Sequence, residues 1–217
     1  MAMQDPAIIR GLYAITPSNL SLDTLVKKTE LLLKRGLKLI QYRDKNLDKK
    51  MLQKNARYLL ELTKEFEAKL IINDHIDVCI DVGADGFHLG FEDYLKKENL
   101  SLINKNKELI NNKLLCGLSC KWNKELVINP PEDLLKWDYL AVGAFYFSKT
   151  KKSKPEKNDE IKKKFLSYTE KPLVAIGGIN NNNLNEIMKM GYACFATSEA
   201  IFKSDPSPLF EKVYKNL

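Results

Sequence analysis

The chain has 217 residues, of which 44% are hydrophobic and 29% charged, and it carries a formal net charge of +7. This size and composition predict a single soluble domain with a full core, spanning residues 1–217. No apolar run approaches the ~18 residues of a membrane span, so we expect no membrane partner. Aromatic residues are not interleaved with the basic ones, which argues against a nucleic-acid partner and favours small anionic ligands.

Cysteine usage and the N-terminus bear on the compartment. The four cysteines, Cys79, Cys116, Cys120 and Cys194, form no CxxC pair. The first residues, MAMQDPAIIR, lack the charged start and apolar segment of an export signal. We therefore expect reduced, packing cysteines and a cytoplasmic protein.

The first half of the chain alternates short apolar runs with helical patterns. The predicted strands are Leu12–Thr16, Leu37–Tyr42, Leu70–Ile72 and Phe87–Leu89. Ser18 or Ser21 can cap the first helix and Gly36 can end it, and the second helix runs from about Asp48 to Phe66. A third helical pattern includes Ile76 and Cys79.

The second half continues the alternation less clearly. The predicted strands are Leu114–Ser119, Tyr139–Phe145, Pro172–Ile176 and Cys194–Thr197. Helices are expected over 94–112 with ragged ends, over Asp159–Tyr168, from Asn180 or Asn181 to Gly191, and over Ser207–Tyr214. Pro130-Pro131 interrupts any helix between residues 121 and 137. Eight strand–helix units of about 25 residues predict an α/β fold, a (β/α)8 TIM barrel.

Two carboxylates open the loops after the third and fourth strands. Asp74 directly follows Asn73, and Asp93 lies just past Gly90. Parallel neighbouring strands deliver both to one rim, where they can share a hard cation such as magnesium. Alternatively, each aspartate caps the helix that follows it. Position alone does not decide between the two.

The other strand ends carry cations, hydroxyls and glycines. They include Gln41, Arg43 and Lys45; Asn73 and His88; Ser119; Ser148, Thr150 and Lys151; Gly177 and Gly178; and Ser198 with Glu199. This set suits a polyphosphate held with a metal ion, and Gly177-Gly178 before a helix is typical of phosphate binding. Any βα turn can carry glycines, however, and the Lys149–Lys157 segment can be a solvated loop. His88 points either into the barrel mouth or, as we favour, into the core.

At these positions the chain resembles the thiamine phosphate synthase family. The matching motifs are GLYAIT at Gly11–Thr16, IQYRDK at Ile40–Lys45, IIND at Ile71–Asp74, VGADGFHLGFED at Val82–Asp93, GLSC at Gly117–Cys120, VGAFYFSKTK at Val142–Lys151 and VAIGGI at Val174–Ile179. Their joint order spans nearly the whole chain and is specific.

The resemblance implies an enzyme that joins hydroxymethylpyrimidine pyrophosphate to thiazole phosphate and releases pyrophosphate. Asp74 and Asp93 would hold the cofactor, a magnesium ion (Mg2+). The implied catalytic residues are Arg43, Lys45, Ser119 and Lys151. The implied substrate-binding residues are Gln41, Arg43, Lys45, Asn73, Ser119, Ser148, Thr150, Lys151 and Gly178. Whether the enzyme is a homo-oligomer stays open.

Three positions depart from the family pattern: Phe91, Ala144 and Glu199. Glu199 falls where a small residue would meet the thiazole phosphate, so its charge should repel that ligand unless it points away or pairs with a lysine. Two rival functions remain. Thiazole tautomerases have a histidine just after the strand-five serine, where this chain has Cys120 and Lys121. A non-catalytic phosphate-ligand sensor is the other, with Glu199 as its best support.

Overall fold

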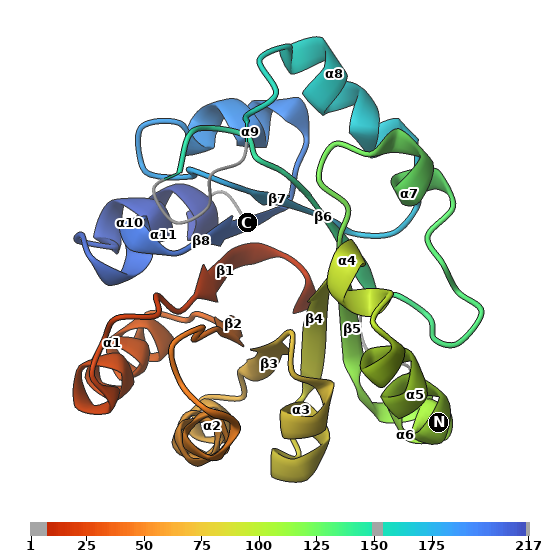
Figure 1. The fold of residues 1–217 in the computed structure, drawn as a ribbon. Coiled ribbons are helices and arrows are strands. Elements are labelled where there is room, and N and C mark those ends of the chain that lie inside the picture. Colours follow the sequence, from red (N-terminus) through yellow and green to blue (C-terminus); the bar gives the residue numbers. More distant parts are fainter. Residues whose placement is uncertain (1–7, 149–153, 216–217) are drawn as a thin grey trace.

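Eight parallel strands close into a barrel in the computed structural model, which describes residues 8–148 and 154–215 (Figure 1). The strands are β1 (Gly11–Ile15), β2 (Leu39–Tyr42), β3 (Lys69–Asn73), β4 (Gly86–Gly90), β5 (Leu115–Ser119), β6 (Tyr139–Gly143), β7 (Leu173–Ile176) and β8 (Cys194–Thr197). Each pairs with its sequence neighbour, and β1 also pairs with β8. The predicted (β/α)8 barrel is confirmed.

Helices surround this barrel on its outside (Figure 1). They are α1 (Leu22–Lys34), α2 (Lys49–Glu65), α3 (Ile76–Val82), α4 (Phe91–Tyr94), α5 (Lys97–Lys105), α6 (Lys107–Lys113), α7 (Lys124–Ile128), α8 (Asp159–Lys164), the 3-10 turn η2 (Phe165–Ser167), α9 (Leu184–Met190), α10 (Glu199–Phe202) and α11 (Ser207–Tyr214).

Local capping residues explain where the long helices begin and end. Ser21 caps α1 by accepting a hydrogen bond from the Thr24 backbone N–H, and Asp48 caps α2 in the same way. Gly36, with φ +93°, follows α1 in the left-handed conformation that ends helices. These predicted boundaries are confirmed to within a residue or two.

Asparagine side chains break two predicted helices. The helix expected over 94–112 is replaced by α5 and α6, after α4 has ended at Tyr94. Asn106 stands between α5 and α6, and its side-chain amide donates to the Leu102 carbonyl at 2.9 Å. The helix expected from Asn180 or Asn181 begins only at Leu184, because Asn183 Oδ1 accepts from the Asn180 N–H at 2.9 Å in a preceding turn. Short amide side chains compete in this way with helical backbone bonds.

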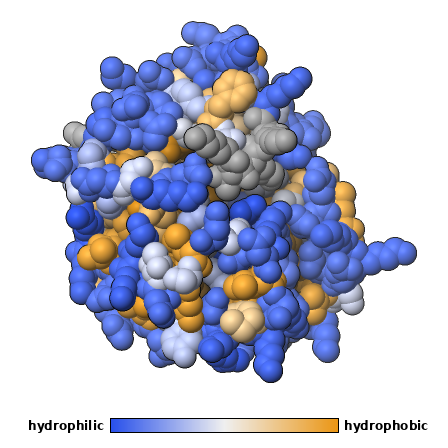
Figure 2. Space-filling model, turned by 60° about the vertical axis from the view of Figure 1, so that its left-hand side comes forward, coloured by the Kyte–Doolittle hydropathy of each residue, from blue (hydrophilic) through white to orange (hydrophobic). Residues whose placement is uncertain are grey.

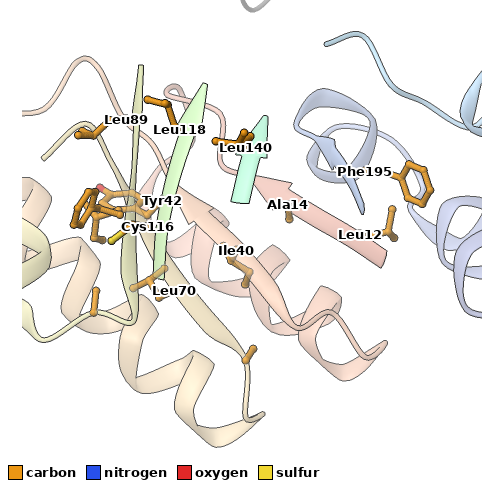
Figure 3. Close-up of a cluster of buried hydrophobic side chains, with 14 of the residues drawn as sticks. Leu12, Ala14, Ile40, Tyr42, Leu70, Leu89, Cys116, Leu118, Leu140 and Phe195 are labelled. Carbon is orange, nitrogen blue, oxygen red and sulfur yellow. The ribbon is translucent and has the colours of Figure 1, made fainter. Parts of the chain in front are cut away.

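The strands are apolar on both faces, as buried parallel strands are. Leu12 and Ala14 of β1 point outward into the main core between the barrel and its helices, together with Ile40 of β2 (Figure 3). Tyr13 and Ile15 point inward into a smaller core that fills the barrel. Alternate residues of each strand therefore face the surrounding helices, and the residues between them face the barrel interior.

Gly117 creates room inside the barrel for two rings. It lies between His88 of β4 and Tyr139 of β6 in the strand register. These two rings stack at a centroid distance of 5.6 Å, inclined by 20°. A Cβ on Gly117 would clash with the Tyr139 ring and would lie 2.6 Å from His88 Nδ1.

One face of the molecule shows the character of its outer surface. Figure 2 shows a face on which hydrophilic residues predominate and apolar residues form small, separated groups. Over residues 8–148 and 154–215, no helix combines the length and apolarity needed to cross a bilayer.

Gly117→Ala should lower the free energy of unfolding by about 1–3 kcal/mol, because the added methyl overpacks the barrel interior. Urea denaturation measures the change. Gly90→Ala is the matched control, since its Cβ would meet only the end of the Asp93 side chain. Equal midpoints for the two variants would contradict the close packing assigned to Gly117.

Candidate active site

A cavity of about 770 Å³ lies at the barrel mouth. Every strand contributes to its lining: Ile15, Gln41, Asn73, His88, Ser119, Gly143, Ile176 and Thr197 all face it. The loops after the strands add Arg43, Ser148 and Gly178, and the start of α10 adds Glu199. This is the face on which barrels of this type carry their chemistry, because the side chains at the strand ends converge there.

Thr16 holds the loop that carries Arg43. Its buried hydroxyl accepts from the Arg43 N–H at 2.8 Å and donates to the Arg43 carbonyl at 3.0 Å. The Thr16 N–H bonds the Gln41 carbonyl at 3.0 Å. The end of β1 therefore fixes the backbone from which the Arg43 guanidinium extends into the cavity.

Polar side chains also occupy the layer just below the mouth. His88 Nε2 lies 2.8 Å from Ser119 Oγ, and His88 Nδ1 lies 3.2 Å from the Tyr139 hydroxyl. Gln41 Nε2 donates to the Tyr13 hydroxyl at 3.0 Å. His88 thus does both things that the sequence left open: it is buried in the interior and it lines the cavity.

The β7 and β8 side of the cavity has the features of an anion site. Gly178 has φ +67°, and a Cβ there would clash with the backbone after β6, so only glycine lets the two loops approach this closely. Ser198 Oγ is buried and has no hydrogen-bond partner among the described residues, although Ser198 lines the cavity. Buried polar atoms are normally paired, so an unpaired hydroxyl here suits a ligand oxygen.

Glu199, the residue expected to repel phosphate, forms an ion pair with Lys203. The two side chains meet at 2.9 Å, one helical turn apart, and both line the cavity. From the sequence, we expected Glu199 to repel phosphate unless it paired with a lysine, and this pairing is observed. Of the other departures, Ala144 lines the cavity and Phe91 packs against the core from α4.

A second hollow of about 500 Å³ lies on the β3 and β4 side of the mouth. Lys45, Asp74 and Asp93 line it, and Asn73 lines both this hollow and the main cavity. The Asn73 side-chain amide donates to Asp74 Oδ2 at 2.7 Å, and Asp93 forms an ion pair with Lys96 at 2.8 Å.

Neither aspartate caps a helix. The residues before α3, α4 and α5 are His75, Gly90 and Lys96, and none of these helices has a side-chain cap hydrogen bond. Asp93 itself lies within α4. Asp74 instead takes a left-handed backbone with φ +62°, which aspartate and asparagine tolerate better than most residues. The capping interpretation of the sequence is therefore wrong.

The two carboxylates line the same hollow and interact electrostatically. Burial first, and then the charge of Asp93, raise the pKa of Asp74, and Lys45 offsets this only in part. Two neighbouring carboxylates suit a hard divalent cation that takes its remaining ligands from water or phosphate. In the described ranges, no three His, Cys, Asp or Glu side chains cluster in a way that could hold a metal. Asp74 and Asp93 therefore suit only a cation site that is completed by water or by ligand oxygens.

The structure brings most of the predicted site residues together. Those on the main cavity are Gln41, Arg43, Asn73, Ser119, Ser148 and Gly178, and those on the second hollow are Lys45, Asn73, Asp74 and Asp93. Thr150 and Lys151 lie outside the described residues.

Sequence reasoning missed several lining residues. Ile15, Ala141 and Ala196 are inward-facing apolar residues near strand ends, which the period of two along each strand could have identified. Lys121 and Lys203 had no such signal, because loop and helix geometry alone brings them to the cavity. The buried cysteines at 79, 116, 120 and 194 are free thiols, as expected, and burial raises the pKa of Cys120 to about 12.

Asp74→Asn should stabilise the fold by about 1 kcal/mol at pH 7. The pKa of Asp74 is higher in the folded than in the unfolded chain, so the stability of the fold falls as the pH rises through these two pKa values. A neutral asparagine at this position avoids that loss. Urea unfolding at pH 7 and at pH 3 measures the gain, which should vanish at pH 3.

Asp77→Asn is the control with the opposite sign. Burial disfavours the charge of Asp77, but Lys49 at 2.6 Å outweighs it and lowers the pKa. This variant should be less stable than the wild type at pH 7, and the difference should fade in acid. An Asp74→Asn variant that is destabilised at pH 7 would contradict the repulsion assigned to this site.

Similar proteins are known for most of the length of this chain. A family model described as thiamine monophosphate synthase matches residues 12–201. The thiamine-phosphate synthase of Nitrosospira multiformis is 37% identical over 89% of this chain and 79% of its own length, and that of Caldicellulosiruptor saccharolyticus is 35% identical over 90% and 85%. The solved thiamine phosphate pyrophosphorylase of Pyrococcus furiosus superposes with a TM-score of 0.75 at 26% identity, over 97% of this chain and 96% of its own. The chain therefore belongs to the thiamine monophosphate synthase family.

Proposed function

We propose that this protein is a thiamine-phosphate synthase that joins hydroxymethylpyrimidine pyrophosphate to thiazole phosphate, with release of pyrophosphate. Family membership and the names of its relatives support this activity. The observation that carries it is the position of Asn73, which lines both the main cavity and the carboxylate hollow. One substrate pyrophosphate can thus reach both spaces.

In the proposed reaction, the main task of the protein is to neutralise the negative charge of the departing pyrophosphate. Pyrophosphate can leave the exocyclic carbon because the electron-rich aminopyrimidine stabilises the resulting cation. Arg43, Lys45 and Ser148 are the described residues proposed to bind the departing oxygens, and Thr150 and Lys151 would join them. Preorganised charge of this kind is commonly the largest catalytic contribution, and no covalent nucleophile is needed.

Asp74 and Asp93 are proposed to hold Mg2+. When bound, the ion would neutralise negative charge on the pyrophosphate. Burial, and then repulsion by Asp93, raise the pKa of Asp74, and the repulsion supports this role because a cation relieves it. Lys96, paired with Asp93, partly neutralises the free site.

The two remaining ligand groups are assigned to opposite sides of the mouth. Gln41, Asn73 and Ser119 would contact the pyrimidine from the β2, β3 and β5 side. Gly178 would bind the thiazole phosphate from the β7 and β8 side, together with the Ser198 hydroxyl, which has no hydrogen-bond partner within the described residues. The thiazole nitrogen would then meet the pyrimidine carbon across the cavity.

A thiazole tautomerase remains the second candidate, since it shares the fold. It is disfavoured by the residue after Ser119: Cys120 is buried and its pKa is raised to about 12, so it offers no base. Release of pyrophosphate from the two substrates separates the two activities. A cytoplasmic location also remains a proposal, and the oligomeric state stays open.

Asp93→Asn should lower turnover about a hundredfold or more at low magnesium while leaving the fold intact, because a leading electrostatic contact is lost. The rate of thiamine phosphate formation, measured against magnesium concentration, tests this. High magnesium should recover part of the loss.

Asp81→Asn is the control, since this α3 carboxylate lies outside both hollows and accepts from Gln53 on α2. It should turn over at the wild-type rate. If Asp93→Asn does the same at low magnesium, the metal role of Asp93 is wrong.

Glu199→Gln should lower the apparent KM for thiazole phosphate about threefold to tenfold. The change removes an anion from the cavity wall and frees Lys203 to face phosphate. Glu30→Gln removes an equivalent helical ion pair, with Lys34 on α1, and should leave KM unchanged. An unchanged KM for Glu199→Gln would place its charge away from the phosphate.

A further inference from the structure

A continuous chain of five polar side chains crosses the barrel interior. Gln41 Nε2 donates to the Tyr13 hydroxyl at 3.0 Å, and the Tyr13 and Tyr139 hydroxyls lie 2.8 Å apart. The Tyr139 hydroxyl is 3.2 Å from His88 Nδ1, and His88 Nε2 is 2.8 Å from Ser119 Oγ. Both ends of the chain, Gln41 and Ser119, line the main cavity. The two tyrosines between them are buried, at 1% and 0% exposure.

The number of protons on these groups determines which group donates in each hydrogen bond of this row of side chains. Burial raises the pKa of Tyr13 and of Tyr139, so each phenol keeps one proton to donate. The Tyr13 oxygen already accepts from Gln41, and among the described residues its hydroxyl contacts only Gln41 and Tyr139. Its proton therefore goes to Tyr139. A buried hydroxyl proton without an acceptor would cost about 1–3 kcal/mol.

The direction then passes through the imidazole. Tyr139 accepts from Tyr13, so its own proton points to His88 Nδ1. A ring nitrogen that accepts carries no proton, which leaves the imidazole proton on Nε2, facing Ser119 Oγ. Ser119 accepts this hydrogen bond, and its own O–H is free to point into the cavity.

We propose that Tyr13 and Tyr139 are positioning residues that hold His88 with its proton on Nε2, and so commit Ser119 to donate a hydrogen bond into the cavity. The ligand atom is an acceptor, either a phosphate oxygen or an unprotonated ring nitrogen. Only the identity of this ligand rests on the proposed function. The opposite order would need Gln41 to turn its carbonyl oxygen towards Tyr13, and it would make Ser119 an acceptor from the ligand.

Nitrogen-15 NMR of the free protein tests the tautomer directly. The chain has only two histidines, His75 and His88, so protein labelled on its imidazoles gives two sets of signals, and His75→Gln assigns them. We expect the His88 proton on Nε2, with the Nδ1 signal shifted upfield by its hydrogen bond. A proton on Nδ1, or on both nitrogens, would overturn the proposal.

Two tyrosine variants extend this measurement. Tyr139→Phe should move the His88 Nδ1 signal downfield, because the donor is lost. Tyr192→Phe also removes a buried hydroxyl, one that donates to the Lys162 carbonyl at 2.7 Å, and should leave the signal in place. If Tyr139→Phe does not fold, the wild-type tautomer alone decides the proposal.

A double-mutant cycle separates positioning from structural support. Tyr139→Phe should lower kcat/KM for the two phosphorylated substrates about fivefold, in the range of one hydrogen bond. In a Ser119→Ala background it should cause no further loss, because Tyr139 acts through Ser119. Additive losses would make Tyr139 a structural residue and overturn the proposal. If even the wild type makes no thiamine phosphate, the proposed function fails, and the NMR result still decides the hydrogen-bond order.

Discussion

The parallel pairing of β1 with β8 is the constraint on which the site depends. It turns eight separate strand–helix units into a closed ring, so every strand ends at the same mouth. Residues as distant in sequence as Gln41 and Glu199 can then line a single cavity. An open sheet of the same strands would leave the ends of β1 and β8 far apart, with Thr16 and Ser198 on opposite edges.

Closure also limits the volume inside the barrel. The residues that fill this volume both pack against one another and form hydrogen bonds. Most of the residues that fill the barrel are apolar, with Leu39, Ile71 and Val174 among them. Beside these residues, tyrosines and His88 satisfy each other's hydrogen bonds, which is the condition for burying polar groups at low cost. Gly117 makes this arrangement possible, because any side chain there would take the volume of the Tyr139 ring. The same residues that fill the core thus support the groups at the mouth.

Charge in the mouth is arranged at some cost to the fold. Asp74 and Asp93 repel each other in the free protein, and Asp74 takes a left-handed backbone. Such local cost is typical of functional sites, where a ligand supplies the missing partner. Glu199 and Lys203 show the contrasting solution, since the chain itself provides the counter-charge. The first pair is suited to recruit a cation, and the second keeps an acidic residue from opposing an anionic ligand.

The sequence by itself determined the fold class and much of the mouth. Eight apolar runs with helical segments between them predicted the barrel, and the polarity of parallel strands predicted that Asn73, Asp74 and Asp93 would meet at one rim. It failed where local asparagine bonds split helices, as at Asn106, and it left both capping and metal binding open for the same aspartates. Whether an aspartate caps a helix depends on where that helix begins, which the folded backbone decides.

Tertiary structure alone decided the contacts that cross the barrel. The hydrogen bond between Tyr13 and Tyr139 joins residues 126 positions apart, and no local pattern encodes it. The arrival of Lys121 and Lys203 at the cavity, and the division of the site into two hollows joined at Asn73, have the same origin. Period and propensity act over a few neighbouring residues, whereas the register and closure of the sheet set which distant side chains share a space.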